Sequence, residues 1–461
     1  MHLSDLTAVA LLAGYAKREV SPVDVMRAVI ARVEKADPKV HATYLFAPER
    51  ALEAAKLSEA RWAKGAPVGA LDGVPATVKD NIATVGEPKP VGTAATELSP
   101  EPLDAPPAAR LREAGAILFA KTTMPDYGML SSGLSSFHQL ARNPWNLDRN
   151  PGGSSAGAGA AGAAGYGPLH VGTDIGGSVR LPAGWCGLFG LKPSAGRIPI
   201  DPPYIGRVAG PMTRSVADSS LLMAVLSQPD TRDYTSLEPR ALEWPTRPKN
   251  LKGLRIGLLG EAGCGWKPNA ETAAAVDRAA RDFEAAGAIV EPLAPFLTQD
   301  NLDGLDKFWR TRSLIDLKAL PRERREKVLP FILAWAESAE GLPGDVVFEG
   351  FSQILEMRRK AIVATLPFDY VLSPTSPVEA YSAELASPSD NPLDPFPHIG
   401  FTVAFNMSEQ PAASINCGFT AAGLPIGLQI IGRRFDDVGV IGVSLAFEAM
   451  RASEARAWPE F

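Results

Sequence analysis

Cysteine and histidine are scarce in this sequence. The three cysteines, Cys186, Cys264 and Cys417, lie far apart, and none of them belongs to a CxxC pair. An odd number of isolated cysteines does not support a disulfide framework. The five histidines show neither HExxH nor any clustered spacing, so we expect no metal site. The histidines are His2, His41, His138, His170 and His398.

Long runs of one residue type are also missing. The net charge is −6 and no block of like charges occurs, whereas binding to nucleic-acid phosphates requires a basic surface. No stretch approaches the roughly 18 consecutive apolar residues of a membrane helix. Asp5, with no basic segment ahead of it, precedes the first apolar stretch, which argues against a secretion signal. We therefore expect a cytoplasmic protein with no membrane span and no nucleic-acid partner.

The chain is long enough, at 461 residues of which 46% are apolar, to bury a large core. Residues 1–65 show helical spacing, with Ser21 as a predicted N-cap followed by Pro22. From Gly73 onward, short β-rich runs alternate with amphipathic helical segments, and a second such alternation covers residues 254–293. These patterns predict an α/β protein with one main core.

Changes in composition and hydrophobic periodicity along the chain predict four segments. Residues 1–65 form a helical segment and residues 66–230 the first part of the core. Residues 231–370 are variable in texture and, from about residue 300, read as charged helices that shape a substrate site. Residues 371–461 return to the same core, with predicted strands in DYVLSP, PAASINCGF and LPIGLQIIG and a final helix in VGVIGVSLAFEAMR.

Three glycine-containing stretches carry candidate chemistry. They are GVPATVKDN from Gly73, PGGSSAG from Pro151 and GTDIGGSVRLPA from Gly172. Together they supply one lysine, Lys79, and two candidate serines on backbone that passes close to its neighbours. A serine hydroxyl needs a base to become a nucleophile, and a lysine becomes a base when burial lowers its pKa. The apolar run before Lys79 makes such burial credible.

Two other motifs compete for the same region. Residues 153–157 fit the G-x-S-x-G nucleophile elbow, which would select Ser155 with His170 or His398 as its base. Residues 157–162 fit G-x-G-x-x-G, which would bind the pyrophosphate of a dinucleotide. Both motifs need a preceding strand, and the preceding ARNPWNLDRNPGG is a loop. A tightly packed alanine-glycine helix explains residues 157–162 better.

Structural interpretations compete with each candidate residue. Lys79 alone would be a solvated lysine at a strand end, and Ser154 would be a turn residue. Ser178 would cap a helix that begins in SVRLPA, and Cys186 would be a small core residue. An aromatic and basic group in the variable segment, consisting of Phe308, Trp309, Arg310 and Arg312, is better explained as a helix face than as a pocket wall.

The three stretches together resemble the amidase signature family. Its motifs are a lysine after a short strand, GGSS, and G[ST]D-x-GGS-[IV]-R-x-P, and all three occur here. Lys79 and Ser154 are 75 residues apart and Ser154 and Ser178 are 24 apart, separations typical of that family. Further likeness lies in GLKPSAGRIP, GPMTRSVAD, FNMSEQPAASINCGF and GLPIGLQIIG, so the resemblance covers nearly the whole chain.

The resemblance implies a fold and a set of roles. The fold is a large mixed β-sheet with helices on both faces, and residues 66–230 hold the catalytic core. Ser178 is then the nucleophile, Ser154 after a cis peptide the proton relay, and Lys79 the base. The remaining implied site residues are Ile175, Gly176, Gly177 and Ser178 as backbone donors to an oxyanion, Asp174 and Arg180 as supports, and Gly128 and Ser131 in the pocket. No cofactor or metal is implied.

The implied activity is hydrolysis of a small amide, anilide or carbamate, with some esters as further substrates in the family. A glutaminase subunit of a glutamyl-tRNA amidotransferase, which works with partner subunits, is the main alternative. FNMSEQPAASINCGF resembles stand-alone amidases more than that subunit, although Ser408 and Glu409 depart from the glycine-containing pattern there. A non-catalytic binding module and a dinucleotide-binding oxidoreductase are more distant alternatives. A homodimer is compatible with the resemblance.

Overall fold

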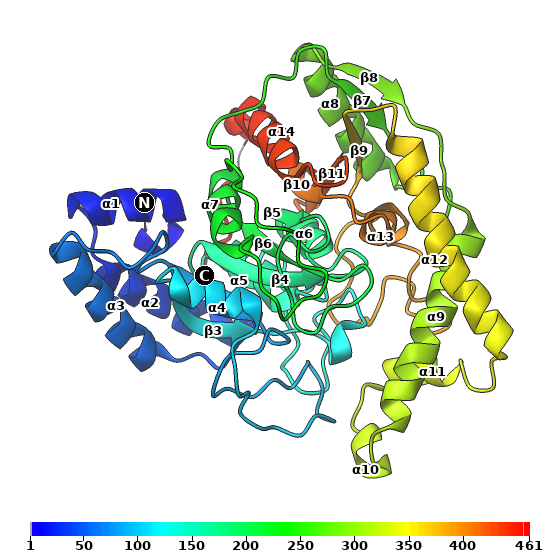
Figure 1. The fold of residues 1–461 in the computed structure, drawn as a ribbon, viewed down its shortest axis with the longest axis horizontal. Coiled ribbons are helices and arrows are strands. Elements are labelled where there is room, and N and C mark those ends of the chain that lie inside the picture. The colour runs from blue at the N-terminus through cyan, green and yellow to red at the C-terminus, as the bar shows by residue number, and fades with distance from the viewer. Residues whose placement is uncertain (1, 455) are drawn as a thin grey trace.

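One β-sheet of eleven strands runs through the molecule, and helices cover it (Figure 1). The structure is a computed structural model that describes residues 2–454 and 456–461. In spatial order the strands are β1-β3-β2-β4-β6-β5-β10-β11-β9-β7-β8. Their bounds are β1 Thr43–Tyr44, β2 Pro75–Lys79, β3 Ile117–Thr122, β4 Leu169–Asp174, β5 Phe189–Lys192, β6 Val208–Thr213, β7 Arg255–Leu258, β8 Ile289–Pro292, β9 Tyr370–Pro374, β10 Ala412–Phe419 and β11 Pro425–Gly432.

Strand directions make the sheet a mixed one. β2 is parallel to both β3 and β4, and β7 is parallel to β8 and β9. Between these parallel parts, β6, β5, β10, β11 and β9 follow one another with antiparallel pairing. The mixed sheet expected from the family resemblance is confirmed.

Three helices form the N-terminal part of the molecule, at the left of Figure 1. They are α1 (Ala8–Lys17), α2 (Pro22–Val40) and α3 (Pro48–Ala63). Ser21 caps α2 as predicted, because its hydroxyl accepts hydrogen bonds from the N–H groups of Val23 and Asp24 at 3.1 and 3.3 Å. Pro22 occupies the first turn, where a missing N–H costs nothing.

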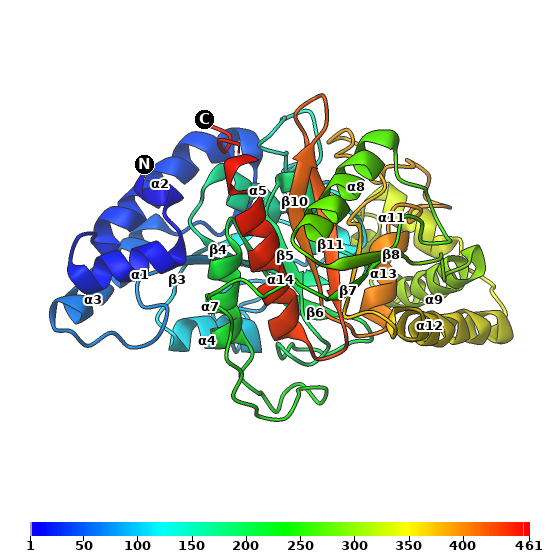
Figure 2. The same ribbon diagram turned by 90° about the horizontal axis from the view of Figure 1, so that it is seen from above.

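Helices pack on both faces of the sheet. On one face, α5 (Ala156–Ala164) and α6 (Arg180–Cys186) contact each other, α5 lies against β2 and β4, and α6 lies against β10 and β11. On the other face, α7 (Val216–Leu226) contacts α4 (Pro106–Glu113) and α14 (Asp437–Met450), with α8 (Ala270–Ala285) nearby on β9 and β10. Figure 2, seen from above, shows α14 and α7 in front of the strands. The two-faced helical covering is confirmed.

A group of helices extends from one side of the sheet, in yellow and yellow-green at the right of Figure 1. These are α9 (Gln299–Lys318), α10 (Arg322–Arg325), α11 (Pro330–Glu337) and α12 (Gly344–Thr365), followed later by α13 (Gly400–Met407). α9 packs along α12 and contacts α11. Their apolar side chains form a second hydrophobic cluster around Leu305, Trp335 and Met357, separate from the cluster that covers the sheet. This part of the chain therefore has its own small core.

The glycines of α5 serve close packing. All nine residues of this helix are buried. A Cβ atom added at Gly157 would lie 2.3 Å from both Ala42 O and Thr123 N, so no larger residue fits there. Between β3 and α5 the described chain contains only a short 3-10 helix at Asp126–Gly128 and no strand. The interpretation as a packed core helix is confirmed, and the dinucleotide-binding interpretation lacks its strand.

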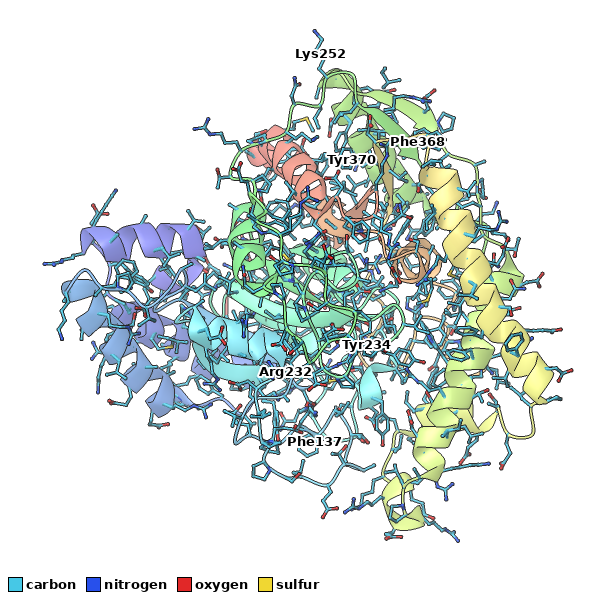
Figure 3. The ribbon with its side chains drawn as sticks, viewed as in Figure 1. Phe137, Arg232, Tyr234, Lys252, Phe368 and Tyr370 are labelled. Carbon is cyan, nitrogen blue, oxygen red and sulfur yellow. The ribbon has the colours of Figure 1, made fainter. Side chains whose placement is uncertain are left out.

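The start of β9 is tied to the start of α14. The Tyr370 hydroxyl donates to Asp436 Oδ2 at 2.8 Å, and Asp436 caps α14 by accepting from Gly439 N. Figure 3 labels Tyr370 next to Phe368, which is 7% exposed. These contacts hold the start of the last helix against β9, which lies inside the sheet between β11 and β7.

No helix among the described residues combines the length and apolar character needed to cross a membrane.

Candidate active site

Lys79 is the last residue of β2 and is completely buried. Its Nζ donates to Ser154 Oγ at 2.8 Å and to Thr173 Oγ1 at 3.0 Å. Asn81 Nδ2 donates to the same Thr173 oxygen at 3.2 Å. These contacts join the ends of the neighbouring parallel strands β2 and β4, which meet at one edge of the sheet. The interpretation of Lys79 as a solvated lysine at a strand end is wrong.

Burial lowers the pKa of the Lys79 amine well below its usual value of 10.5, because a charged ammonium is costly away from water. The positive charge of Arg207 lowers this pKa further, while Asp174 and Asp80 act in the opposite direction. A lysine in this environment has a free lone pair at a lower pH than a surface lysine. It can therefore accept a proton from a hydroxyl.

Ser154 lies on a loop before α5, after a cis peptide bond from Gly153. A Cβ at Gly153 would lie 2.4 Å from Ser132 N, so glycine is required for this approach. On the other side, a Cβ at Gly128 would lie 3.1 Å from Ser154 Oγ. The Ser154 hydroxyl is thus held between Lys79 and the backbone of Gly128, and it is 4% exposed.

Ser178 follows the loop that leaves β4. It is 9% exposed and lines the same cavity as Ser154. The N–H of Ser155 donates to the carbonyl of Ser178 at 3.2 Å, which fixes the two serine loops against each other. Ser178 is not a helix cap, because α6 begins at Arg180 with Val179 before it and no side chain caps it. Tertiary structure therefore brings together Lys79, Ser154 and Ser178.

Asp174 and Arg180 fix the loop that carries Ser178. They form a fully buried ion pair at 2.9 Å, and Arg180 also donates to Gln429 Oε1 and Asn406 Oδ1 at 2.6 and 2.5 Å. The Asp174 carboxylate accepts from the N–H groups of Gly177 and Val179 at 2.8 and 3.0 Å. The Arg180 charge and these hydrogen bonds more than offset burial, so the pKa of Asp174 lies far below its usual value.

One of the four backbone donors implied by the resemblance is already engaged. Gly177 N–H donates to Asp174, and Gly177 is absent from the cavity wall. Its φ of +127° is a conformation open to glycine, and it turns the N–H toward the carboxylate. Ile175, Gly176 and Ser178 do line the cavity. In this structure the Gly177 N–H is therefore engaged by Asp174, and the oxyanion role of the four residues stays a prediction.

The cavity itself has a volume of about 490 Å³, enough for a small organic molecule. Gly128 and Ser131 belong to its wall, as the loosely matched YGMLSSG stretch suggested. The Ser131 carbonyl is fixed by a hydrogen bond from the Tyr381 hydroxyl at 2.8 Å. The wall also contains Asn81, Lys89, Val91, Tyr127, Met129, Leu130, Thr173, Pro202, Pro203, Tyr204, Arg207, Trp309, Arg312, Asp316, Phe396 and Ile399.

Part of this wall comes from a segment that the sequence interpretation assigned to a plain helix face. Trp309 and Arg312 of α9 line the cavity, so for these two residues that interpretation is wrong. For the others it holds: Arg310 pairs with Asp306, and the Phe308 ring packs against Phe351 in a tilted arrangement. Trp309 and Arg312 are three residues apart and so lie on one face of α9, but nothing in the local sequence says which face meets the cavity.

Thr173 and Asn81 were also missed. Both bond within the Lys79 cluster, and Thr173 occupies the [ST] position of the G[ST]D motif. This motif position was the sequence signal that could have identified Thr173. Tyr204 and Arg207 had no signal, because they lie in a loop without a motif of its own.

The competing nucleophiles are positioned differently. Ser155 is fully buried, where its hydroxyl donates to Thr173 O and accepts from Thr173 N, both at 3.2 Å. His170 bonds to Thr77 and Gly167, and burial lowers its pKa to about 4. His398 stacks on Trp185. The nucleophile-elbow interpretation therefore has no serine-histidine contact to support it.

Cys186 is fully buried, and its Sγ donates to Pro151 O at 3.2 Å. Burial raises the pKa of its thiol, so the thiolate is disfavoured. Its interpretation as a core residue is confirmed. Across residues 2–454 and 456–461, no cluster of three or more His, Cys, Asp or Glu side chains could hold a metal ion.

Replacing Arg180 by methionine should destabilise the fold by about 3–5 kcal/mol, because the buried Asp174 charge would lose its partner. The measurement is the free energy of unfolding from urea titration. Arg322→Met is the matched control, since the exposed Arg322–Glu326 pair on α10 should change this free energy little. Equal effects of the two substitutions would contradict a structural role for the Asp174–Arg180 pair.

Comparison with known proteins identifies the family of this chain. The Amidase family model matches residues 24–441. The A subunit of the glutamyl-tRNA(Gln) amidotransferase of Myxococcus xanthus (strain DK1622) is 36% identical, with 97% of this chain and 98% of that protein covered. A solved bacterial aryl acylamidase is 29% identical with a TM-score of 0.89, and 97% and 96% of the two chains are covered. For 6-aminohexanoate cyclic dimer hydrolase these values are 26%, 0.86, 100% and 99%. The chain belongs to the amidase signature family of hydrolases, which act on carbon–nitrogen bonds.

Proposed function

We propose that this protein is a stand-alone amidase that cleaves the acyl carbon–nitrogen bond of an amide, anilide or carbamate through an acyl-enzyme on Ser178. One observation carries the proposal. Lys79, a buried lysine of lowered pKa, lies 2.8 Å from the hydroxyl of Ser154. Ser154 and Ser178 both line the same cavity. A base, a relay and a nucleophile are the minimum needed for covalent acyl transfer without histidine.

In the first half of the reaction, Ser178 Oγ attacks the substrate carbonyl carbon. Its proton passes to Ser154 Oγ, while the Ser154 proton passes to the neutral Lys79 Nζ. The tetrahedral intermediate then collapses, and the proton returns along the same path to the leaving nitrogen. The amine departs and the acyl group stays on Ser178.

In the second half, water takes the place of the amine. Ser154 and Lys79 remove its proton as it attacks the acyl-enzyme, and the acid is released with Ser178 restored. Thr173 and Asn81 hold the lysine cluster in place during both halves. The same two proton carriers therefore serve both steps.

Charge that develops on the carbonyl oxygen requires fixed donors. We assign this role to the backbone N–H groups of Ile175, Gly176 and Ser178, all on the cavity wall. The Gly177 N–H instead bonds Asp174, which with Arg180 keeps the loop rigid. Each such donor is worth about 3–4 kcal/mol in the transition state of comparable enzymes.

A second candidate function is that of the glutaminase component of a glutamyl-tRNA amidotransferase. The full-length similarity to the Myxococcus xanthus protein favours it. The similarity in fold to an aryl acylamidase and to a cyclic dimer hydrolase favours the stand-alone enzyme. Both functions use a nucleophile, relay and base of the same kind, so the site geometry is common to them.

The test is rapid-quench intact-mass spectrometry of the purified chain with anilides, carbamates, esters and L-glutamine, followed by peptide mapping. A stand-alone amidase should release amine without any partner and carry an acyl adduct on Ser178. Ammonia from glutamine alone, with no product from the other substrates, would favour the second candidate. No adduct and no product from any substrate would overturn the proposed function.

A further inference from the structure

Two arginines lie on the wall of the catalytic cavity, and they come from distant parts of the chain. Arg207 directly precedes β6, and Val208 pairs with Asp174 in the antiparallel β4–β6 ladder. Arg207 therefore lies beside Ile175, where the proposed oxyanion loop begins. Arg312 belongs to α9, which packs along α12 outside the sheet (Figure 1).

Tyr204 connects the two arginines. The backbone N–H of Arg207 donates to the Tyr204 carbonyl at 3.0 Å, and the Arg312 guanidinium lies over the Tyr204 ring, 4.9 Å from its centre. Tyr204, Arg207 and Arg312 all line the cavity, and the Arg207 side chain donates from Nη1 to the carbonyl of Pro202, another wall residue. This wall is built from the loop before β6 and from one face of α9.

Neither arginine forms an ion pair with a carboxylate of the described residues. Across the described ranges 2–454 and 456–461, neither guanidinium has a carboxylate oxygen within 4.0 Å. Arg207 donates from its side chain to Pro202 O at 3.3 Å, and Arg312 contacts Met129 Sδ at 3.5 Å. Arg312 Nε is buried without any hydrogen-bond partner. A buried N–H of a charged group costs free energy unless an acceptor meets it.

Other charges on the wall do not cancel this pair. Lys89 is paired with Glu101 at 3.3 Å, and Asp174 is paired with Arg180. Asp316 lies one helical turn beyond Arg312 and is exposed, so water screens its charge. The cavity therefore carries an excess of positive charge at Arg207 and Arg312.

The two like charges also act on each other. Burial lowers the pKa of Arg207, and the charge of Arg312 lowers it further, while Asp201 acts in the opposite direction. Arginine stays protonated in proteins, so this repulsion persists in the empty cavity. An anion between the two groups would relieve it and supply the missing acceptor.

We propose that Arg207 and Arg312 form a subsite for a carboxylate of the substrate, so that this enzyme acts on amides that carry a carboxylate close to the scissile bond. The inference rests on the proposed function, because the subsite and Ser178 share one cavity. Trp309, Phe396 and Ile399 give the wall an apolar part, which fits a substrate with an apolar or aromatic portion. Guanidinium groups bind a planar carboxylate through charge-assisted hydrogen bonds.

Matched substrates test the proposal. On the acyl side, the para-nitroanilide of succinic acid is compared with that of levulinic acid, where a methyl ketone replaces the carboxylate. On the amine side, para-acetamidobenzoate is compared with para-acetamidoacetophenone. In at least one pair, kcat/KM for the carboxylate should exceed that for the ketone by about 10- to 100-fold, the effect of one or two charged hydrogen bonds.

Variants locate the effect. Arg312→Gln and Arg207→Gln should each reduce the carboxylate-to-ketone ratio by about tenfold, and the double variant should bring it close to one. The ratio is used because Arg207→Gln also changes the surroundings of Lys79 and Ile175, which affects both substrates alike. Lys318→Gln is the control: it removes one positive charge from α9 at an exposed residue paired with Glu340. It should leave the ratio unchanged.

Binding separates this inference from the proposed function. In Ser178→Ala protein, calorimetry should give a Kd for the carboxylate of the preferred pair that is about 10- to 100-fold lower than the Kd for the matching ketone. Turnover with equal kcat/KM for carboxylates and ketones in both pairs would overturn the subsite and leave the amidase intact. No turnover and no Ser178 adduct, with the Kd difference present, would overturn the proposed function and support the subsite. Equal Kd values in both pairs overturn the subsite.

Discussion

Ser178→Ala protein is expected to lose at least about 10⁴-fold in kcat and to form no acyl adduct with any substrate. The reason is that alanine removes the only hydroxyl at the position where the loop after β4 meets the cavity. The measurement is single-turnover kinetics with intact-mass analysis on the same samples.

Ser155→Ala is the matched control for this experiment. Ser155 is the neighbour of Ser154 and the serine that the G-x-S-x-G pattern would select, but it is fully buried against Thr173. Its replacement should leave the adduct on Ser178 detectable. The unfolding midpoint of Ser178→Ala should match that of the wild-type protein, because truncating Ser178 at the cavity wall removes no core packing. An adduct that persists in Ser178→Ala and disappears in Ser155→Ala would contradict the proposed nucleophile.

Lys79→Met is expected to lower kcat by about 10²- to 10⁴-fold, the usual range for loss of a general base. Methionine keeps the length and the burial of the side chain but cannot accept a proton. Wild-type activity should rise with pH, because lysine is a base only after it has lost its proton. Since burial and Arg207 lower the Lys79 pKa, the rise should have its midpoint well below 10.5.

The check is the pH dependence of kcat/KM for the two proteins over the range where circular dichroism shows both to be folded. The wild-type rise should be absent from the residual activity of Lys79→Met. Wild-type activity that falls with increasing pH over this range would exclude Lys79 as the base.

Stability offers an independent check on the state of Lys79. Its pKa is lower in the folded protein than the 10.5 of an unfolded chain, so between these two values the unfolded chain binds a proton that the folded one does not. The free energy of unfolding should therefore rise with pH through that window. In Lys79→Met this rise should be smaller, as measured by urea titration at several pH values. An identical pH slope in both proteins would mean that Lys79 is charged in the fold.

Much of the fold could be predicted from local patterns. The periodic segments near residues 74–80, 254–260 and 271–287 correspond to β2, β7 and α8 within a few residues. β4, β5 and β6 were not delimited in advance. These strands are buried on both faces, so their side chains do not alternate between polar and apolar, and Gly172, Gly190 and Pro211 weaken the strand signal further.

For the site, three short motifs and their resemblance to the amidase signature family led to Lys79, Ser154 and Ser178, because the family's motifs consist of adjacent residues. The sequence could not show that Lys79 is buried beside Arg207, that Gly177 turns its N–H toward Asp174, or that α9 contributes Arg312 to the cavity. Each of these depends on which segments pack together, and contacts across a hundred or more residues leave no periodic pattern in a single chain. The motifs thus indicate the reaction type, whereas the packing of α9 and of the loop before β6 decides which side chains line the cavity.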